Sequence, residues 1–184
     1  MDDLYYYKQF ILGDDDALAQ LVERHNKALI NFIYSYTNNY EDAEDVVADT
    51  FLKLFIKKPN FNGNSSFKTW LYRIAINEAL LKKRKEKKII KENIDDHYEL
   101  SNNDDLNDIE QTLTDEKKDI LNKTLENIHS DYRAALKLMY YDNFSIDEIC
   151  IIMNKNKKQV NNLLFRGKIA LKRELEKVGF NNED

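Results

Sequence analysis

The stretch from Ser145 to Leu164 decides the fold of the C-terminal part of the chain, and it reads SIDEICIIMNKNKKQVNNLL. Ser145 followed three residues later by Glu148 forms a capping box, the pattern that begins a helix. Asn156 and Gln159 have the same spacing. Two capped helices joined by a turn of three or four residues predict a helix-turn-helix motif. We expect these helices to bury Ile146, Ile149, Cys150, Met153, Val160, Leu163, Leu164, Leu171 and Leu175.

The second of these helices has a one-sided charge. Residues 155–173 contain seven basic side chains and no acidic one, and the early turns expose Lys157, Lys158, Asn161 and Asn162. In a helix-turn-helix protein the first residues of the second helix reach base edges in the major groove. Lysine pairs with phosphate or guanine and asparagine with adenine. A solvated helix face is the alternative, but the caps and the one-sided charge favour DNA contact.

Upstream, apolar residues recur at helical spacing from Phe10 to Tyr36, until the pair Asn38-Asn39 interrupts the pattern and caps a further helix over residues 41–55. This helix has an apolar stripe of Val47, Phe51, Leu54 and Phe55. Its first turns are acidic with no basic residue among them: Glu41, Asp42, Glu44, Asp45 and Asp49. Because their spacing fits neither a calcium loop nor a carboxylate bundle, we interpret them as a protein-binding or solvated face.

A loop follows over residues 57–66, which contains the only proline and Gly63. A third helix then extends to about residue 88, with Phe67, Trp70, Leu71, Ile74 and Leu81 expected on its buried side. Its last part, residues 82–88, adds a charge of +5. Aromatic side chains beside a positive surface are typical of single-stranded DNA binding. From these residues alone, however, Phe67 and Trp70 fit a helix core better.

The charge distribution predicts two domains. Residues 1–91 carry 15 basic and 13 acidic side chains, residues 92–126 carry 3 and 12, and residues 127–184 carry 10 and 8. We therefore expect an all-α protein with one helical domain over 1–91, a flexible acidic linker over 92–114 and a second domain over 115–184. Further helices are expected at 115–128 and 132–141, before the helix-turn-helix at 145–164.

Composition disfavours several classes of protein. No apolar run approaches the roughly 18 residues of a membrane span, and the acidic N-terminus is unlike a secretory signal. The lone Cys150 excludes an internal disulfide and is typical of a reducing cytoplasm. The three histidines lie far apart, and no phosphate-binding, dinucleotide or nucleophile motif is present. We expect a cytoplasmic protein with no enzymatic activity, cofactor, metal or small-molecule substrate.

Three stretches together resemble the extracytoplasmic-function sigma factors of the sigma-seventy family. Residues 42–55, DAEDVVADTFLKLF, are similar to the helix by which these factors bind the polymerase clamp. Residues 67–77, FKTWLYRIAIN, are similar to the family's promoter-melting helix, and the helix-turn-helix is the third stretch. The resemblance implies two helical domains, sigma two and sigma four, with core RNA polymerase and promoter DNA as partners. It also implies an anti-sigma factor, which in this family is often membrane-anchored.

The resemblance implies three sets of site residues. The residues implied for polymerase binding are Asp42, Glu44, Asp45, Asp49, Phe51 and Leu54. Recognition of the minus-ten element falls to Phe61, Asn62, Gly63, Asn64, Ser65, Arg73 and Asn77. Recognition of the minus-thirty-five element falls to Lys157, Lys158, Asn161, Asn162 and Arg166. The linker is expected to thread toward the polymerase active site and RNA exit channel.

Two departures and two alternatives stand beside this interpretation. Asn161 and Leu163 occupy positions that are basic in many members, and Gly167, where alanine is usual, costs a helix up to about 1 kcal/mol. A stand-alone helix-turn-helix regulator explains the C-terminal helices but not the acidic helix. A protein that sequesters polymerase without reading DNA is the other alternative. The net charge of −5 predicts weak binding to free DNA, since that binding rests on phosphate neutralisation.

Overall fold

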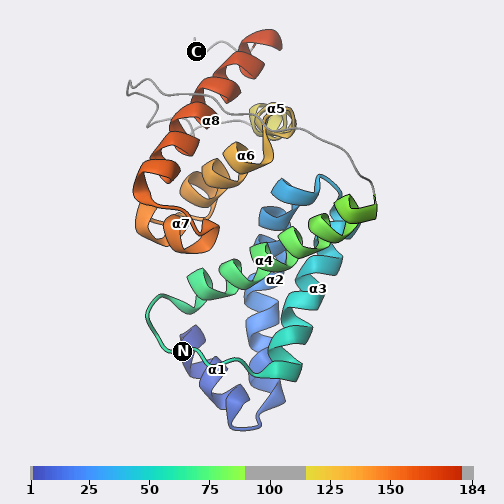
Figure 1. The fold of residues 1–184 in the computed structure, drawn as a ribbon, viewed down its shortest axis with the longest axis vertical. Coiled ribbons are helices and arrows are strands. Elements are labelled where there is room, and N and C mark those ends of the chain that lie inside the picture. The colour runs from blue at the N-terminus through green and yellow to red at the C-terminus, as the bar shows by residue number, and fades with distance from the viewer. Residues whose placement is uncertain (1, 90–114, 180–184) are drawn as a thin grey trace. The chain divides into compact units, whose positions relative to one another are not determined.

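The computed structural model describes residues 2–89 and 115–179, and all the regular structure in these residues is helical (Figure 1). They divide into two compact units, which are described separately here. The first is built on helices α1–α4, and the second on α5, α6, η1 and α8, with α7 directly before α8 in the chain. The expected all-α fold with two small helical domains is confirmed. The expected acidic linker, residues 92–114, lies outside the described residues.

The first unit consists of α1 (Asp3–Ile11), α2 (Asp15–Thr37), α3 (Tyr40–Lys57) and α4 (Phe67–Ile89). Helix α2 packs against the other three, and Figure 1 shows α4 crossing α2 and α3. Its core is formed by large side chains with almost no exposed surface: Phe10, Leu21, Leu29, Phe32, Ile33, Leu54, Leu71 and Tyr72. Leu81, which we expected on the buried side of α4, is 45% exposed.

The helical spacing expected without a break from Phe10 to Tyr36 is interrupted near its start. Helix α1 ends at Ile11, and Gly13 has a φ of +107°, a conformation that favours glycine. Asp14 then caps α2 by accepting a hydrogen bond from the amide of Ala17. The spacing of apolar residues gave no sign of this break, because it continues on both sides of the turn.

The second unit is built on α5 (Asp115–Glu126), α6 (Ser130–Leu136), η1 (Lys137–Tyr141) and α8 (Lys157–Lys177), and α7 (Ile146–Met153) precedes α8 in the chain. Helix α8 packs against α5 and α6. The helix expected over 132–141 is therefore an α-helix that continues as the π-helix η1. Ala135 and Leu136 are buried as expected, whereas Met139 is only half-buried.

Both predicted caps of the helix-turn-helix are present. The amide of Glu148 donates to Ser145 Oγ at 3.4 Å, and the amide of Ser145 donates to Glu148 Oε2 at 3.0 Å. Asn156 and Gln159 form the same reciprocal pair, with both hydrogen bonds at 2.9 Å. Asn154, with a φ of +53°, ends α7 in the left-handed conformation. The helix-turn-helix prediction is confirmed.

Gly167 has a packing role that offsets its low helix propensity. A Cβ atom added at this position in α8 would lie 3.2 Å from Leu136 Cγ and 3.3 Å from Tyr132 Cβ, both in α6. These distances are shorter than most contacts of real Cβ atoms. The missing side chain therefore allows α6 and α8 to approach closely.

Candidate polymerase and nucleic-acid interfaces

The acidic residues at the start of α3 form a solvent-facing surface. Asn39 caps the helix by accepting a hydrogen bond from the amide of Asp42 at 3.1 Å. The opposite side of α3 is buried by Ala43, Val46, Val47, Thr50, Phe51 and Leu54. Glu44, Asp45 and Asp49 are consequently exposed, and Asp42 is half-buried. Their position in the first turns is also favoured by the helix dipole.

Lys82 of α4 neutralises part of this acidic surface. Its Nζ atom lies 2.7 Å from Asp42 Oδ1 and 3.4 Å from Asp45 Oδ2. The pKa of Lys82 is raised, chiefly by the hydrogen bond to Asp42. Asp45 nevertheless keeps 69% of its side chain exposed. Glu44, Asp45 and Asp49 therefore stay exposed on this surface, and Asp42 is held against α4.

Two residues that we expected to contact polymerase lie in the core instead. Phe51 is 7% exposed and Leu54 is fully buried, so neither offers a contact surface in this structure. The large exposed apolar residues of the same helix are Tyr40, Leu52, Phe55 and Ile56, at 53%, 53%, 47% and 67%. Leu52 and Ile56 are not among the expected site residues, because the resemblance assigns polymerase binding by position and does not report which apolar residues of the helix are exposed.

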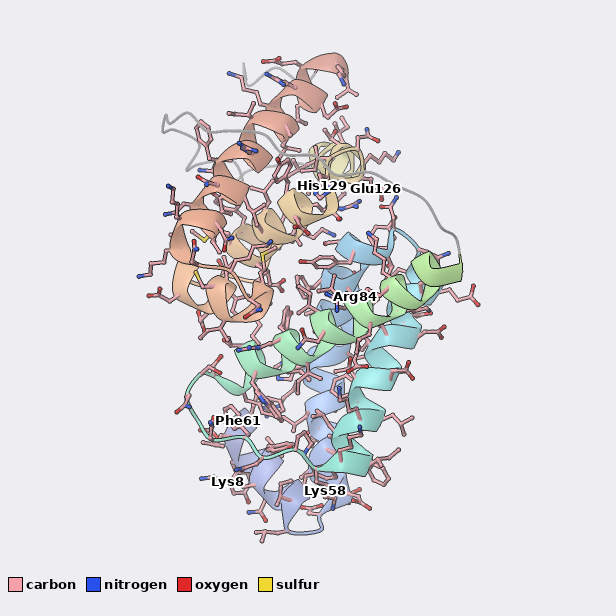
Figure 2. The ribbon with its side chains drawn as sticks, viewed as in Figure 1. Lys8, Lys58, Phe61, Arg84, Glu126 and His129 are labelled. Carbon is pink, nitrogen blue, oxygen red and sulfur yellow. The ribbon has the colours of Figure 1, made fainter. Side chains whose placement is uncertain are left out.

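The loop before α4 rests on an aromatic cluster made by Tyr7, Phe61, Phe67 and Trp70. Tyr7 and Phe67 are buried, whereas Phe61 and Trp70 are half-buried. Ring centroids lie 5.1 Å apart for Phe61 and Trp70, and 5.2 Å apart for Tyr7 and Trp70. Figure 2 shows Phe61 on the loop close to α1. Phe67 is thus a core residue, while Phe61 and Trp70 also have part of their surface exposed.

The remaining minus-ten candidates lie on the loop and on the exposed side of α4. Asn62, Gly63 and Asn64 are exposed, Ser65 is half-buried, and Gly63 has a φ of +75°. Ser66 then caps α4, since its Oγ atom accepts a hydrogen bond from the amide of Thr69 at 3.1 Å. Arg73 and Asn77 are both exposed and, four residues apart, share one helix face. Because α4 begins directly after the loop, this face of the helix continues from the loop along the chain.

The phenol of Tyr7 connects α1 to the start of the loop and has a raised pKa. It donates a hydrogen bond to the carbonyl of Pro59, and burial raises the pKa of Tyr7 from 10.0 to about 12. The neutral phenol is therefore favoured in the folded state. This contribution to stability is complete below pH 10 and is lost as pH rises toward 12.

We expect the free energy of unfolding of the wild type to fall between pH 10 and pH 12, relative to Tyr7→Phe, by at most about 3 kcal/mol. Urea unfolding at several pH values measures this difference, and lysine titration cancels between the two proteins. Tyr5→Phe, at a 43% exposed tyrosine of the same helix, is the control and should follow the wild type. Parallel curves for wild type and Tyr7→Phe would contradict the prediction.

The minus-thirty-five candidates on α8 differ in their exposure and in their contacts. Lys158 and Asn161 are exposed and Asn162 is half-buried, and their spacing places them on neighbouring turns. Lys157 is also exposed but forms an ion pair with Asp147 of α7 at 2.8 Å, and the hydrogen bond to Asp147 raises the pKa of Lys157. Arg166 is half-buried. Sequence alone gave no sign of the pair that ties Lys157 to the preceding helix.

Within residues 2–89 and 115–179 no group of three His, Cys, Asp or Glu side chains is placed to hold a metal ion. No helix in this part of the chain is long and apolar enough to cross a membrane.

Taken together, these surfaces define a class of protein. One unit has an acidic helix face and a polar loop before an aromatic-rich helix, and the other has a doubly capped helix-turn-helix whose second helix exposes lysine and asparagine. A helix-turn-helix with this side-chain inventory is typical of proteins that read duplex DNA.

Comparison with known proteins identifies the family. Residues 21–89 match Sigma-70 region 2, and residues 118–171 match Sigma-70 region 4. The ECF RNA polymerase sigma-E factor of Escherichia coli is 31% identical over 171 residues, which cover 86% of each chain. The ECF RNA polymerase sigma factor SigW of Bacillus subtilis is 28% identical over 182 residues, which cover 91% of this chain and 94% of SigW.

Solved structures show the same fold. The sigma factor RpoE of Bartonella quintana, in complex with the anti-sigma factor NepR, is 24% identical with a TM-score of 0.64. That comparison covers 86% of this chain and 96% of RpoE. CnrH, in complex with the cytosolic domain of CnrY, is 22% identical with a TM-score of 0.65 and covers 95% and 97% of the two chains.

This chain belongs to the extracytoplasmic-function group of the sigma-70 family. It is a sigma factor that directs RNA polymerase to promoters. Sigma factors are not enzymes, and the acidic helix that a stand-alone regulator left unexplained lies within the region 2 match.

Proposed function

We propose that this sigma factor assigns its three tasks to three exposed surfaces: polymerase binding to α3, minus-ten reading to the loop before α4, and minus-thirty-five reading to α8. One observation carries this proposal. In each of the three stretches that resemble the family, the apolar residues are mostly buried while acidic or amide side chains stay exposed. The exposed sets differ in charge, as their different partners require.

The polymerase surface combines acidic and apolar residues. Glu44, Asp45 and Asp49 give it a negative charge, and Leu52 and Ile56 continue it along α3. A charged rim steers association, while burial of apolar side chains contributes most of the affinity. In this proposal Phe51 and Leu54 hold the helix in place from the core and do not touch polymerase.

The minus-ten surface runs from the loop onto α4. Asn62 and Asn64 present amide groups, which can donate and accept hydrogen bonds to an unpaired base. The exposed parts of Phe61 and Trp70 offer a stacking surface, and Arg73 supplies a positive charge for the phosphate backbone. Stacking and hydrogen bonding offset the few kcal/mol that unstacking a base costs.

The minus-thirty-five surface centres on Lys158, Asn161 and Asn162, which are close to the capped start of α8. In this proposal Lys157 also binds DNA, by leaving its ion pair with Asp147 and pairing with a phosphate group instead. That exchange is inexpensive because an exposed ion pair contributes only about 0–1 kcal/mol.

We also propose that an anti-sigma factor controls this chain, in keeping with the solved relative RpoE, which is in complex with the anti-sigma factor NepR. A membrane-anchored partner fits the same scheme, with the sigma factor in the cytoplasm. The proposed role uses binding alone and involves no catalytic step or cofactor.

The substitution Lys158→Glu tests the assignment of α8. We expect it to lower transcription by about 5- to 150-fold at limiting polymerase, since one lost base or phosphate contact costs about 1–3 kcal/mol. The template is a promoter selected from a random library by the wild-type holoenzyme. Binding to core polymerase should not change. Lys177→Glu, at the far end of α8, is the matched control. Equal transcription by Lys158→Glu and wild type across minus-thirty-five variants would refute the assignment.

A further inference from the structure

Helix α1 precedes the region 2 match, which begins at residue 21, yet it makes direct contact with the loop proposed to read the minus-ten element. Tyr7 is the centre of this contact. It is 2% exposed, and its hydroxyl group donates to the carbonyl of Pro59, 52 residues along the chain. That carbonyl lies two residues before Phe61, at the start of the loop.

The ring of Tyr7 holds the same loop through its aromatic residues. Its centroid lies 6.5 Å from that of Phe61 in an edge-to-face arrangement and 5.2 Å from that of Trp70. It also lies 5.3 Å from Phe67, the first residue of α4. One side chain of α1 therefore contacts the loop at its start and at Phe61, and also the helix that follows.

A second contact from α1 reinforces the first. Lys58, in the left-handed conformation at the end of α3, lies with Nζ 3.5 Å from the carbonyl oxygen of Phe10 and 4.6 Å from the centroid of its ring. Helix α1 is itself fixed to α2, since Asp3 accepts a hydrogen bond from Arg24 and lies 2.8 Å from His25 Nε2. The start of the loop is thus held by contacts with α1, which is itself held by α2.

Beyond Phe61 the loop has few restraints of this kind. Asn62, Gly63 and Asn64 are exposed, and the chain becomes helical after the cap formed by Ser66. A loop of this length loses conformational entropy when it captures a base, and the loss is smaller when its ends are already fixed. Discrimination between bases requires that the amide groups be held in place before the base arrives.

We propose that Tyr7 is a positioning residue for promoter recognition, which holds the loop over residues 60–65 in the shape that discriminates minus-ten bases. The inference rests on the proposed role of this loop. Tyr7 does not contact DNA in this proposal. It acts through the carbonyl of Pro59 and the ring of Phe61.

The test uses Tyr7→Phe, which keeps the ring and removes only the hydroxyl group. Full-length protein is combined with core polymerase, and transcription is measured on the selected promoter and on all single-base variants of its minus-ten and minus-thirty-five elements. We expect the preference for the best minus-ten base to fall about fivefold, the equivalent of one hydrogen bond. Minus-thirty-five preference and core binding should not change. Tyr5→Phe is the control for loss of a tyrosine hydroxyl from α1.

Two additional measurements show whether a negative result contradicts the role of Tyr7 or the role of the loop. Hydrogen exchange of the free protein should show faster exchange of the amides of residues 60–66 in Tyr7→Phe and not in Tyr5→Phe. The double variant Asn62→Ala with Asn64→Ala tests the loop itself. If that variant loses minus-ten preference while Tyr7→Phe keeps it, the inference is wrong and the role of the loop stands. If the loop variant keeps its preference, the proposed role of the loop fails and the inference with it. An equal loss at both promoter elements in Tyr7→Phe would indicate a general folding defect and would also overturn the inference.

Discussion

The double substitution Asp45→Lys with Asp49→Lys is expected to weaken binding to core RNA polymerase by about 100-fold or more. Both side chains are exposed on α3, so the change alters the charge of the surface without altering the core. Like charges brought together at an interface cost several kcal/mol, and each 1.4 kcal/mol is tenfold in affinity. Titration of labelled protein with core polymerase measures the loss directly.

The matched control for this experiment is Asp15→Lys with Asp16→Lys. These residues are exposed at the start of α2, and the change in net charge is identical. We expect the control to retain most of the wild-type affinity at moderate salt. Equal loss in both variants would show that polymerase senses only the overall charge, and the assignment of the α3 surface would fail.

The second large effect separates a core leucine from an exposed one two residues away on the same helix. Leu54 is fully buried, so Leu54→Ala should lower the free energy of unfolding by about 2–5 kcal/mol through lost burial and a residual cavity. Leu52 is 53% exposed, and Leu52→Ala should change stability by less than about 0.5 kcal/mol while weakening polymerase binding. Urea unfolding and polymerase titration of both variants provide the comparison.

The alternative outcome for this pair is equally clear. If Leu52→Ala binds polymerase as tightly as wild type, the apolar half of the proposed surface is not part of the interface. If Leu54→Ala is as stable as wild type, the packing of α3 described here is wrong. Because the two substitutions remove the same atoms from the same helix, differences in helix propensity cancel between them.

Features fixed by neighbouring residues were predictable from the sequence. The caps at Ser145 and Asn156 depend on partners three residues away, and the structure has both. The end of α2 at Asn38 and the cap at Asn39 were predictable for the same reason. The break at Gly13 was not, since apolar spacing alone does not report a turn between two helices of similar pattern.

Features that depend on distant residues were not predictable. Leu54 and Phe55 both belong to the apolar stripe of one helix, and only the packing of α2 and α4 against α3 decides that Leu54 is buried and Phe55 is 47% exposed. The contact between Tyr7 and Pro59 joins residues 52 apart, and that between Lys157 and Asp147 joins two helices. Gly167 was interpreted only as a weak helix former, because its neighbours in α6 are far away in sequence.

The ion pair between Lys157 and Asp147 has a consequence for how binding to DNA responds to salt. A lysine that meets a phosphate normally releases a condensed cation, and each such contact steepens the dependence of affinity on ionic strength. Lys157 already has a carboxylate as its counterion, so its transfer to phosphate leaves Asp147 to recruit a cation from solution. Cation release at the DNA is then balanced by cation uptake at the protein. We therefore expect the proposed binding through α8 to be less sensitive to ionic strength than its number of basic side chains implies.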